Sequence, residues 1–332
     1  MANEVKKVNT IAITDIKNIN AITDTNLKEL NLLEFTGIVD FTWSTGGVYP
    51  SGLQSHGGAG TQLAALSVGG HDGTNYLASC GEYTGPATST WSQVGVGSMS
   101  GVRAVSAVGG SQTSGITVGG QDASAAVDTV ETYGGSSWSS EAAFTQDTSA
   151  LNGCGAGTSN TSFLVAGGDG YPGGAPLDVT EVFNGSTWSD SATMDNATHY
   201  MMTFGASDDC FVVGGYGYPS QHNYVQHLSS GSFSVLSATL VSHSRQQAGC
   251  FGTTSSGLIV GGAGKHLSGD SWGDIATSEQ WNGTAWALED VYPGGTCDNT
   301  QGTGFRASGT GGGLMWGGAP ASGNTDYTGE YG

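Results

Sequence analysis

The sequence predicts an all-β protein built from six copies of one four-stranded unit. The first observation is a glycine pair that ends a short apolar run at six places in the 332-residue chain. Successive pairs are spaced by 50, 48, 47, 47 and 56 residues, which indicates that a single structural unit is repeated. The first glycines of the pairs are Gly69, Gly119, Gly167, Gly214, Gly261 and Gly317.

The second observation is a motif that follows each glycine pair by 11 to 17 residues, in most copies a glutamate and then an aromatic residue. A tight turn and a tryptophan come next, as in Asn184-Gly185 before Trp188 and Asn282-Gly283 before Trp286. Asn-Gly between apolar residues is typical of a β-hairpin with a type I′ turn. The pair Gly134-Gly135 is expected to play the same part before Trp138.

The third observation is a stretch of small residues before each glycine pair, for example at 153–157, 201–206 and 248–252. Each unit therefore contains four short strands: a small-residue inner strand, an apolar strand, a strand ending in the aromatic, and an outer strand with tryptophan. Four antiparallel strands in roughly 48 residues is typical of a β-propeller blade. Inner strands crowd round the axis, which explains their small residues. The sequence thus predicts six blades.

The two ends of the chain complement each other. The last unit stops at Glu330-Tyr331, before any outer strand, and a matching segment from Asp40 to Trp43 stands near the start. We expect residues near 38–45 to complete the sixth blade beside the C-terminal strands, so that residues 34–332 close without exposed sheet edges. The fourth unit departs from the pattern, because Gln226-His227-Leu228 and Phe233 replace the usual residues and weaken the evidence for its outer strand.

Charge and composition exclude several classes of partner. The chain has 28 acidic and 8 basic residues, and four of the basic ones lie in the first 28 positions. Binding to nucleic acid or to an anionic membrane surface is therefore not expected. No apolar run is long enough to cross a bilayer, and no signal peptide is recognised. The five scattered cysteines are expected to be small buried apolar residues rather than disulfides or zinc ligands.

Residues 1–33 form a separate segment. It contains two related copies of an Ile-Thr-Asp pattern, in which the Thr-Asp pair suits the start of a short helical turn. Apolar stripes this short do not fold alone, so the segment is expected either to pack against the propeller or to dock on another subunit. The residues assigned to this attachment role are Ile11, Ile13, Ile16, Ile19, Ile22, Leu27 and Leu30.

The repeat resembles the kelch repeat of β-propellers, since Gly-Gly after an apolar strand is followed by an aromatic residue and then a tryptophan. More specifically, the segments 60–70 and 277–286 are similar to degenerate kelch-like arrays in virion structural proteins of marine tailed bacteriophages. The paired Ile-Thr-Asp segments look like the N-terminal segments of such proteins.

The resemblance implies a non-enzymatic structural protein of the virion, placed as a tail fibre, a head protrusion or a capsid decoration. Such a protein would be made in the host cytoplasm and carried in several copies on the particle. It would contact other virion proteins through residues 1–33 and attach to a host surface glycan or receptor.

The expected binding surface is the face where the loops after the second strands and the loops between blades emerge together. Aromatic side chains offer apolar faces to sugar rings, while carboxylates and amides bind hydroxyl groups. The candidate ligand-binding residues on this face are His71, Asp72, Tyr76, Asp169, Tyr171, Tyr216, Tyr218, His222, Tyr224, His266 and Trp272, with Asp270 beside them.

Other chemistries are weighed against this binding role. A glycan-active enzyme on the same face is the alternative function. A sialidase would use Arg103, Arg245 and Arg306, but its Asp-and-Gly turn motif is not matched. Copper oxidation would need tyrosine, histidine and cysteine ligands, whose spacing is not fixed here. No cofactor is expected, although Asp208-Asp209, Asp169 and Asp178 are candidate ligands for a structural calcium ion.

Overall fold

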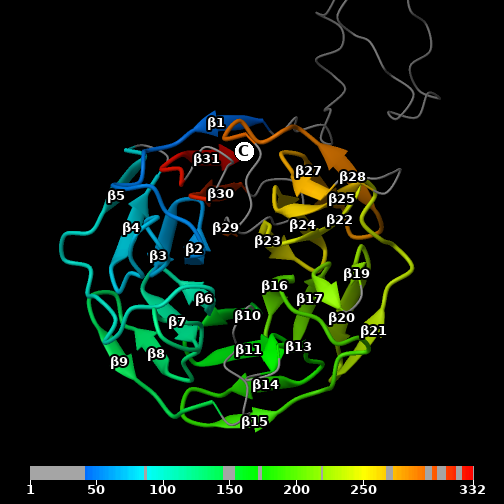
Figure 1. Cartoon of the computed structure of the whole chain (residues 1–332), viewed down its shortest axis with the longest axis horizontal. Coiled ribbons are helices and arrows are strands. Elements are labelled where there is room, and N and C mark those ends of the chain that lie inside the picture. Colours follow the sequence, from blue (N-terminus) through cyan, green and yellow to red (C-terminus); the bar gives the residue numbers. More distant parts are fainter. Residues whose placement is uncertain are drawn as a thin grey trace, which may run out of the picture. The chain divides into compact units, whose positions relative to one another are not determined.

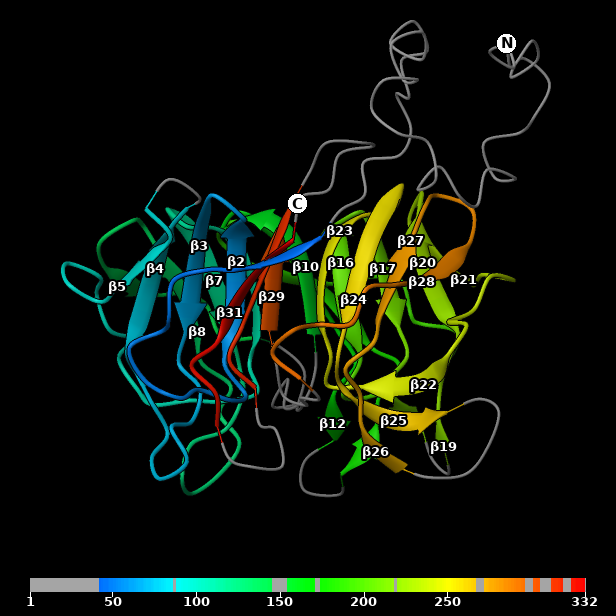
Figure 2. The same ribbon diagram turned by 90° about the horizontal axis from the view of Figure 1, so that it is seen from above.

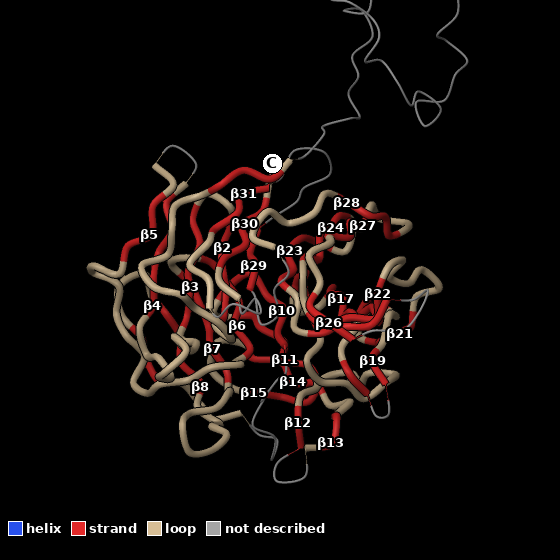
Figure 3. The backbone as a smooth tube through the Cα atoms, turned by 45° about the horizontal axis from the view of Figure 1, so that its top comes forward, coloured by secondary structure: helices blue, strands red, loops and turns tan. Residues whose placement is uncertain are grey.

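The computed structural model describes most of the unit Phe41–Gly332. Its described parts contain strands and loops and no helix (Figure 3), so the predicted all-β class is confirmed. A membrane-spanning helix is likewise not found in them. The described residues are 42–85, 88–144, 154–170, 174–217, 220–266, 272–295, 301–304, 312–318 and 324–331.

Six four-stranded antiparallel sheets make up this unit, and each has the same internal order. The first strand of each sheet, here called the inner strand, pairs with the apolar second strand. The inner strands are β2 (Gly57–Thr61), β6 (Ala107–Ser111), β10 (Cys154–Ser159), β16 (Met202–Ala206), β23 (Gly249–Thr253) and β29 (Gln301–Gly304). The second strands are β3 (Ala64–Val68), β7 (Ser114–Val118), β11 (Ser162–Ala166), β17 (Asp209–Val213), β24 (Ser256–Val260) and β30 (Gly313–Trp316).

The third and outer strands complete the sheets, which we number 1 to 6 by their inner strands. Third strands are β4 (Cys80–Thr84), β8 (Val130–Tyr133), β14 (Thr180–Phe183), β20 (Val225–Ser229), β27 (Ser278–Trp281) and β31 (Thr328–Tyr331). Outer strands are β5 (Thr90–Ser92), β9 (Trp138–Ser140), β15 (Trp188–Asp190), β21 (Ser232–Val235), β28 (Trp286–Glu289) and β1 (Trp43–Thr45). The outer strand of sheet 4 is present, with Phe233 opposite Leu228.

The six inner strands are neighbours of one another in the order β2, β6, β10, β16, β23 and β29, and β29 lies beside β2 again. Figure 1 shows the sheets arranged in sequence order around a centre, with the outer strands on the periphery. Small residues dominate the inner strands as expected. In sheets 1 to 5 a glycine with positive φ stands near the end of each inner strand, where a Cβ atom would meet a carbonyl group of the second strand.

The sixth sheet takes its outer strand from the other end of the chain. Strand β1 pairs with β31, with Trp43 opposite Tyr331 and Thr45 opposite Gly329, which confirms the predicted pairing of the two ends. The attachment segment 1–33 lies outside the described residues, and so do all seven of its assigned apolar residues.

The glycine pairs allow the chain to pass from one sheet to the next. Both glycines of a pair have positive φ, for example 59° at Gly69 and 100° at Gly70. The N–H of Gly70 donates to the carbonyl of Arg103 in the linker to sheet 2, at 2.8 Å. The same bond forms in three other described pairs, from Gly168 to Thr198, Gly215 to Arg245 and Gly318 to Leu53. A side chain at either glycine would collide with linker backbone, so the glycine pattern follows from this contact.

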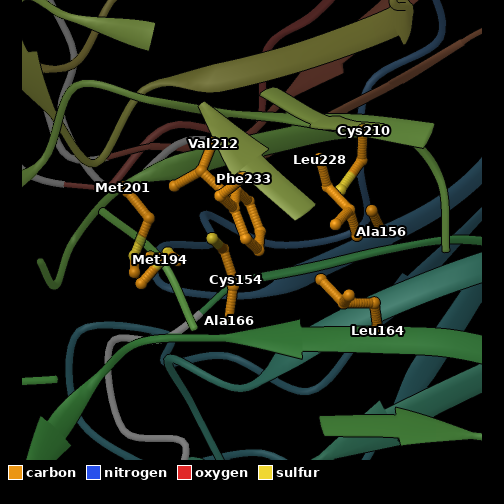
Figure 4. Close-up of a cluster of buried hydrophobic side chains, with 10 residues drawn as sticks. All are labelled: Cys154, Ala156, Leu164, Ala166, Met194, Met201, Cys210, Val212, Leu228 and Phe233. Atoms are coloured by element: carbon orange, nitrogen blue, oxygen red, sulfur yellow. The ribbon is translucent and has the colours of Figure 1, made fainter. Parts of the chain in front are cut away.

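Neighbouring sheets pack by placing large side chains against glycine. The ring of Phe163 in β11 fills the space beside Gly109 and Gly155, and Phe204 in β16 lies against Gly257. Between sheets 3 and 4 the core contains smaller and sulfur-containing side chains (Figure 4), including Cys154, Cys210, Met194 and Met201. Close contact between the sheets therefore excludes water from each interface.

In four sheets the buried position two residues before the aromatic of the third strand is filled in one of two ways. In sheets 2 and 5 it is Glu131 or Glu279, each paired with a buried arginine from the preceding linker. In sheets 1 and 6 it is glycine, and a tyrosine ring from the linker occupies the space. A Cβ atom at Gly81 would lie 3.0 Å from the ring of Tyr49, and one at Gly329 would lie 2.8 Å from Tyr292. Thus a tyrosine packed on a glycine fills this position in sheets 1 and 6, whereas an arginine–glutamate ion pair fills it in sheets 2 and 5.

One prediction about the outer hairpins was wrong in its detail. The hairpins at Asn184-Gly185 and Asn282-Gly283 form as expected, but only the glycines have positive φ, 94° and 90°. A type I′ turn needs positive φ at both central residues. Here the asparagine Oδ1 instead accepts N–H groups two and three residues ahead, which holds a longer loop. Both φ values are positive in the two-residue turn Ser230-Gly231.

The close approach of linker backbone to the glycine pairs can be tested with Gly120→Ala in sheet 2. The φ of Gly120 is 98°, and its new Cβ would lie 2.5 Å from the carbonyl oxygen of Ala104. Gly95→Ala is the control, because its φ is 82° but its Cβ would meet nothing within 4 Å. We expect Gly95→Ala to cost about 1 kcal/mol and Gly120→Ala at least about 3 kcal/mol in urea denaturation. Equal losses would contradict the proposed role of the pair.

A second prediction concerns His56, which is fully buried and whose ring lies against Gly317 and Trp316. Burial lowers the pKa of His56 to about 3. The unfolded chain therefore takes up the proton more readily between about pH 6.5 and 3. Above about pH 6.5 this proton uptake does not reduce the free energy of unfolding. As the pH falls from about 6.5 towards 3, the free energy of unfolding declines by up to about 1.4 kcal/mol per pH unit.

His56→Leu removes this titration, so its unfolding free energy should fall less between pH 7 and pH 4.5 than that of the unmodified protein. Urea denaturation at pH 7 and pH 4.5 measures this pH dependence for the variant and for the unmodified protein. Identical slopes would mean that His56 takes up its proton in the folded state at its ordinary pKa.

Candidate functional site

The loops after the second strands and the linkers between sheets meet at the same end of the sheets, here called the loop end. Backbone bridges join them, as between Gln54 and His71 and between His199 and Tyr216. Sheets 3, 4 and 5 carry additional strands at this end (Figure 2): β12 (Asp169–Gly170), β13 (Ala175–Pro176), β18 (Tyr216–Gly217), β19 (Ser220–Gln221), β22 (His243–Gln246), β25 (Ala263–His266) and β26 (Trp272–Asp274). The predicted shared face is therefore present, and the additional strands make sheets 3, 4 and 5 differ there from sheets 1 and 2.

The candidates of sheet 1 hold loops together. Asp72 Oδ1 accepts the N–H groups of Thr74 and Asn75, and these bonds, that of Asn75 first, lower the pKa of the Asp72 carboxyl. Tyr76 accepts a hydrogen bond at 2.5 Å from Gln121 of the sheet 2 loop, and its ring meets the edge of His71. His71, Asp72 and Tyr76 are thus engaged within the scaffold.

Asp169 lies at the start of the sheet 3 extension and is buried. Its carboxylate pairs with Nδ1 of His199, which stands in the linker to sheet 4. The opposite ring nitrogen of His199, Nε2, is buried without a hydrogen-bond partner among the described residues. The imidazole also lies between two tyrosine rings, with centroids 4.5 Å from Tyr200 and 5.3 Å from Tyr216.

The hairpin of sheet 4 carries Tyr216 and two further aromatic rings, those of His222 and Tyr224. Tyr216 lies opposite Gln221, and His222 stacks on Tyr224 with a centroid distance of 4.3 Å. Burial lowers the pKa of His222 and raises the pKa of Tyr224 to about 12. The Tyr224 hydroxyl has no partner in the described structure. We define the Tyr216 site as Asp169, His199, Tyr200, Tyr216, His222 and Tyr224.

His199 and Tyr200 did not appear among the sequence candidates, because they precede an inner strand rather than follow a glycine pair. Their position in the sequence could have indicated them, because His199 lies three residues before β16 and the linkers pass through the loop end just before each inner strand. Two candidates, Tyr171 and Tyr218, lie outside the described residues, as does Asp270. His266 and Trp272 are placed by their backbone in the three-stranded extension of sheet 5.

The arginines have structural roles at equivalent positions. Arg103 pairs with Glu131, and Arg245 donates to Glu279 at 2.8 Å and to the carbonyl groups of Gly261 and Thr277 at 3.0 Å. Both side chains are buried. Two of the three arginines considered for a sialidase, Arg103 and Arg245, therefore hold linkers against sheets. Arg306 lies outside the described residues.

Cysteines and acidic candidates for metals are dispersed. Four described cysteines are free, and burial raises the pKa of Cys80, Cys210 and Cys250 to about 12, so these thiols stay protonated at neutral pH. Cys297 lies outside the described residues. Asp209 begins β17 and binds His227 and Thr254, while Asp169 follows β11 at the opposite end. The searched residues include no group of three or more potential metal ligands.

A separate concavity runs between the inner strands of sheets 1 to 5. Half of its lining residues are glycines, and Val108, Thr203, Phe204, Cys250 and Phe251 are the larger residues beside them. Thr203 donates to the carbonyl of Gly155 at 2.6 Å, and the Cys250 thiol donates to that of Thr203 at 3.1 Å. These bonds join neighbouring inner strands. The candidate ligand-binding residues named above do not line this concavity.

Comparisons with known proteins give no family for the chain. Its sequence matches no protein-family model and shows no significant similarity to a curated protein. The geometry of the loop end is therefore the main guide to function.

Proposed function

We propose that residues 34–332 form a six-bladed kelch-like β-propeller closed by pairing of its two ends. Support comes from six sheets of equal strand order, from inner strands that neighbour one another through all six sheets, and from the β1–β31 pairing. A β-propeller accounts for the narrow, glycine-rich inner strands and for the tryptophans on the outer strands.

The propeller, in this proposal, is a non-enzymatic virion protein that serves as a fibre, head protrusion or capsid decoration and is present in several copies. The resemblance of its repeats to the kelch-like arrays of marine tailed phages supports this assignment. Residues 1–33 attach it to other virion proteins, and the acidic propeller binds neither nucleic acid nor a membrane. The loop end faces the host surface.

One observation carries the binding role: the Tyr216 site gathers half-buried aromatic rings with two polar atoms that have no partner in the described structure. Tyr216, Tyr200 and Tyr224 offer apolar ring faces, while the Tyr224 hydroxyl and His199 Nε2 offer hydrogen bonds. Sugars present both an apolar ring face and hydroxyl groups, so this combination suits a host surface glycan.

A glycan-active enzyme is the competing function. Hydrolysis commonly uses two carboxyl groups about 5 to 10 Å apart. At the loop end Asp72 and Asp122 each hold two N–H groups of their own turns, and Asp169 holds His199. Their present hydrogen bonds favour structural roles, so binding without hydrolysis is the better-supported proposal.

Glycan binding is tested on an oligosaccharide array with the full chain and two variants. Tyr216→Ala removes a ring of the site and should weaken binding about tenfold, as expected for the loss of one stacking contact. Tyr76→Phe is the matched control, since Tyr76 belongs to the loop contacts of sheet 1, and it should bind as the unmodified protein does. Lack of any glycan signal, or equal binding by Tyr216→Ala, would refute this function.

The attachment role is tested by deleting residues 1–33. Particles assembled with the shortened protein should lack it, because the apolar residues of the segment are missing, while its circular dichroism and thermal unfolding should match those of the full chain. Immunoblots of purified particles measure incorporation. Normal incorporation would show that another surface makes the attachment.

A further inference from the structure

The described surface has few cationic side chains. Arg103 and Arg245 are buried in ion pairs, and Lys265 is the exposed cation of the described chain. The net charge of the whole chain is −20. An anionic ligand approaching the described surface therefore finds few positive partners and a repulsive field.

Acidic side chains are distributed over the loop end itself. They come from the loops of four different sheets and are exposed or half-exposed: Asp72, Asp122, Asp274 and Asp326. They share this end of the sheets with the Tyr216 site, so their combined charge opposes the binding of sulfated, phosphorylated or sialylated glycans. The opposition weakens with salt, because exposed charges are screened.

Two polar atoms inside the Tyr216 site have no hydrogen-bond partner in the described structure. The Tyr224 hydroxyl and His199 Nε2 are buried and have no partner in the described structure, whereas the Asp169 carboxylate is already held by Nδ1 of His199. Hydroxyl groups of a sugar can donate to one such atom and accept from the other. An ammonium group would gain less, because the nearby carboxylate is engaged.

We infer that the Tyr216 site selects neutral, hydroxyl-rich saccharides and discriminates against their acidic derivatives. The inference rests on the proposed glycan-binding function and names its ligand class. Stacking on the tyrosines supplies attraction for any sugar, and the charge of the loop end decides between neutral and acidic members of a pair.

The experiment uses an array of paired oligosaccharides, each neutral member printed beside its sulfated or sialylated derivative, and the full-length protein. At 50 mM NaCl the neutral member of each bound pair should bind at least about tenfold more tightly, and at 500 mM NaCl the difference should fall to about threefold or less. Tyr216→Ala should lower binding to the neutral members. Lys265→Met should leave it unchanged.

The outcomes separate the two proposals. Absence of Tyr216-dependent binding to any member overturns the glycan-binding function together with this inference. Tyr216-dependent binding that is equal or tighter for acidic members, or tightest for cationic amino sugars in a parallel set of chitosan oligomers, overturns the neutral selectivity alone. Loss of binding in Lys265→Met would likewise indicate an anionic ligand.

Discussion

The structure depends on a backbone contact between a glycine pair and the linker that leaves its sheet, which forms in sheets 1, 3, 4 and 6. The second glycine donates its N–H to a linker carbonyl, and the positive φ values of both glycines leave no space for side chains. Because the acceptor is a carbonyl, the linker residue itself is free to vary. Leucine, arginine and threonine all occupy this position, at Leu53, Arg103, Thr198 and Arg245. A strict glycine requirement therefore coexists with divergent linkers.

The same freedom explains why the sheets fill their buried linker-facing position by different means. Arg245 with Glu279 and Tyr292 with Gly329 each satisfy the space as a set. Sheet 4 uses a third solution, in which Gln226 exchanges hydrogen bonds with the backbone of Asn196. A well-bonded buried ion pair and an apolar filling of similar volume differ little in stability. One repeat can thus use the arginine–glutamate pair where another uses tyrosine with glycine, but one residue of such a combination cannot be exchanged alone.

The sequence was most informative where backbone constraints recur. Glycine spacing, outer-strand tryptophans and the last repeat predicted the strand order of the sheets. They also predicted that residues near 38–45 lie beside the C-terminal strands, as β1 does with Trp43 opposite Tyr331. It was less informative where side chains decide the local structure. The Asn184 turn takes its form from Oδ1 hydrogen bonds rather than from the dipeptide alone. For Asp72 and Tyr76, which are predicted ligand-binding residues, the sequence did not indicate that nearby N–H and amide groups engage them.

The unequal loop end follows from how each sheet stabilises its loop. In sheets 1 and 2 an aspartate closes a short turn, so the loop needs little further support. In sheets 3 to 5 added strands stabilise longer loops through backbone hydrogen bonds, which make few demands on side chains. Side chains on these extensions are therefore free to vary without loss of the fold. A binding site is expected where the scaffold constrains sequence least, and the Tyr216 site lies in that part of the loop end.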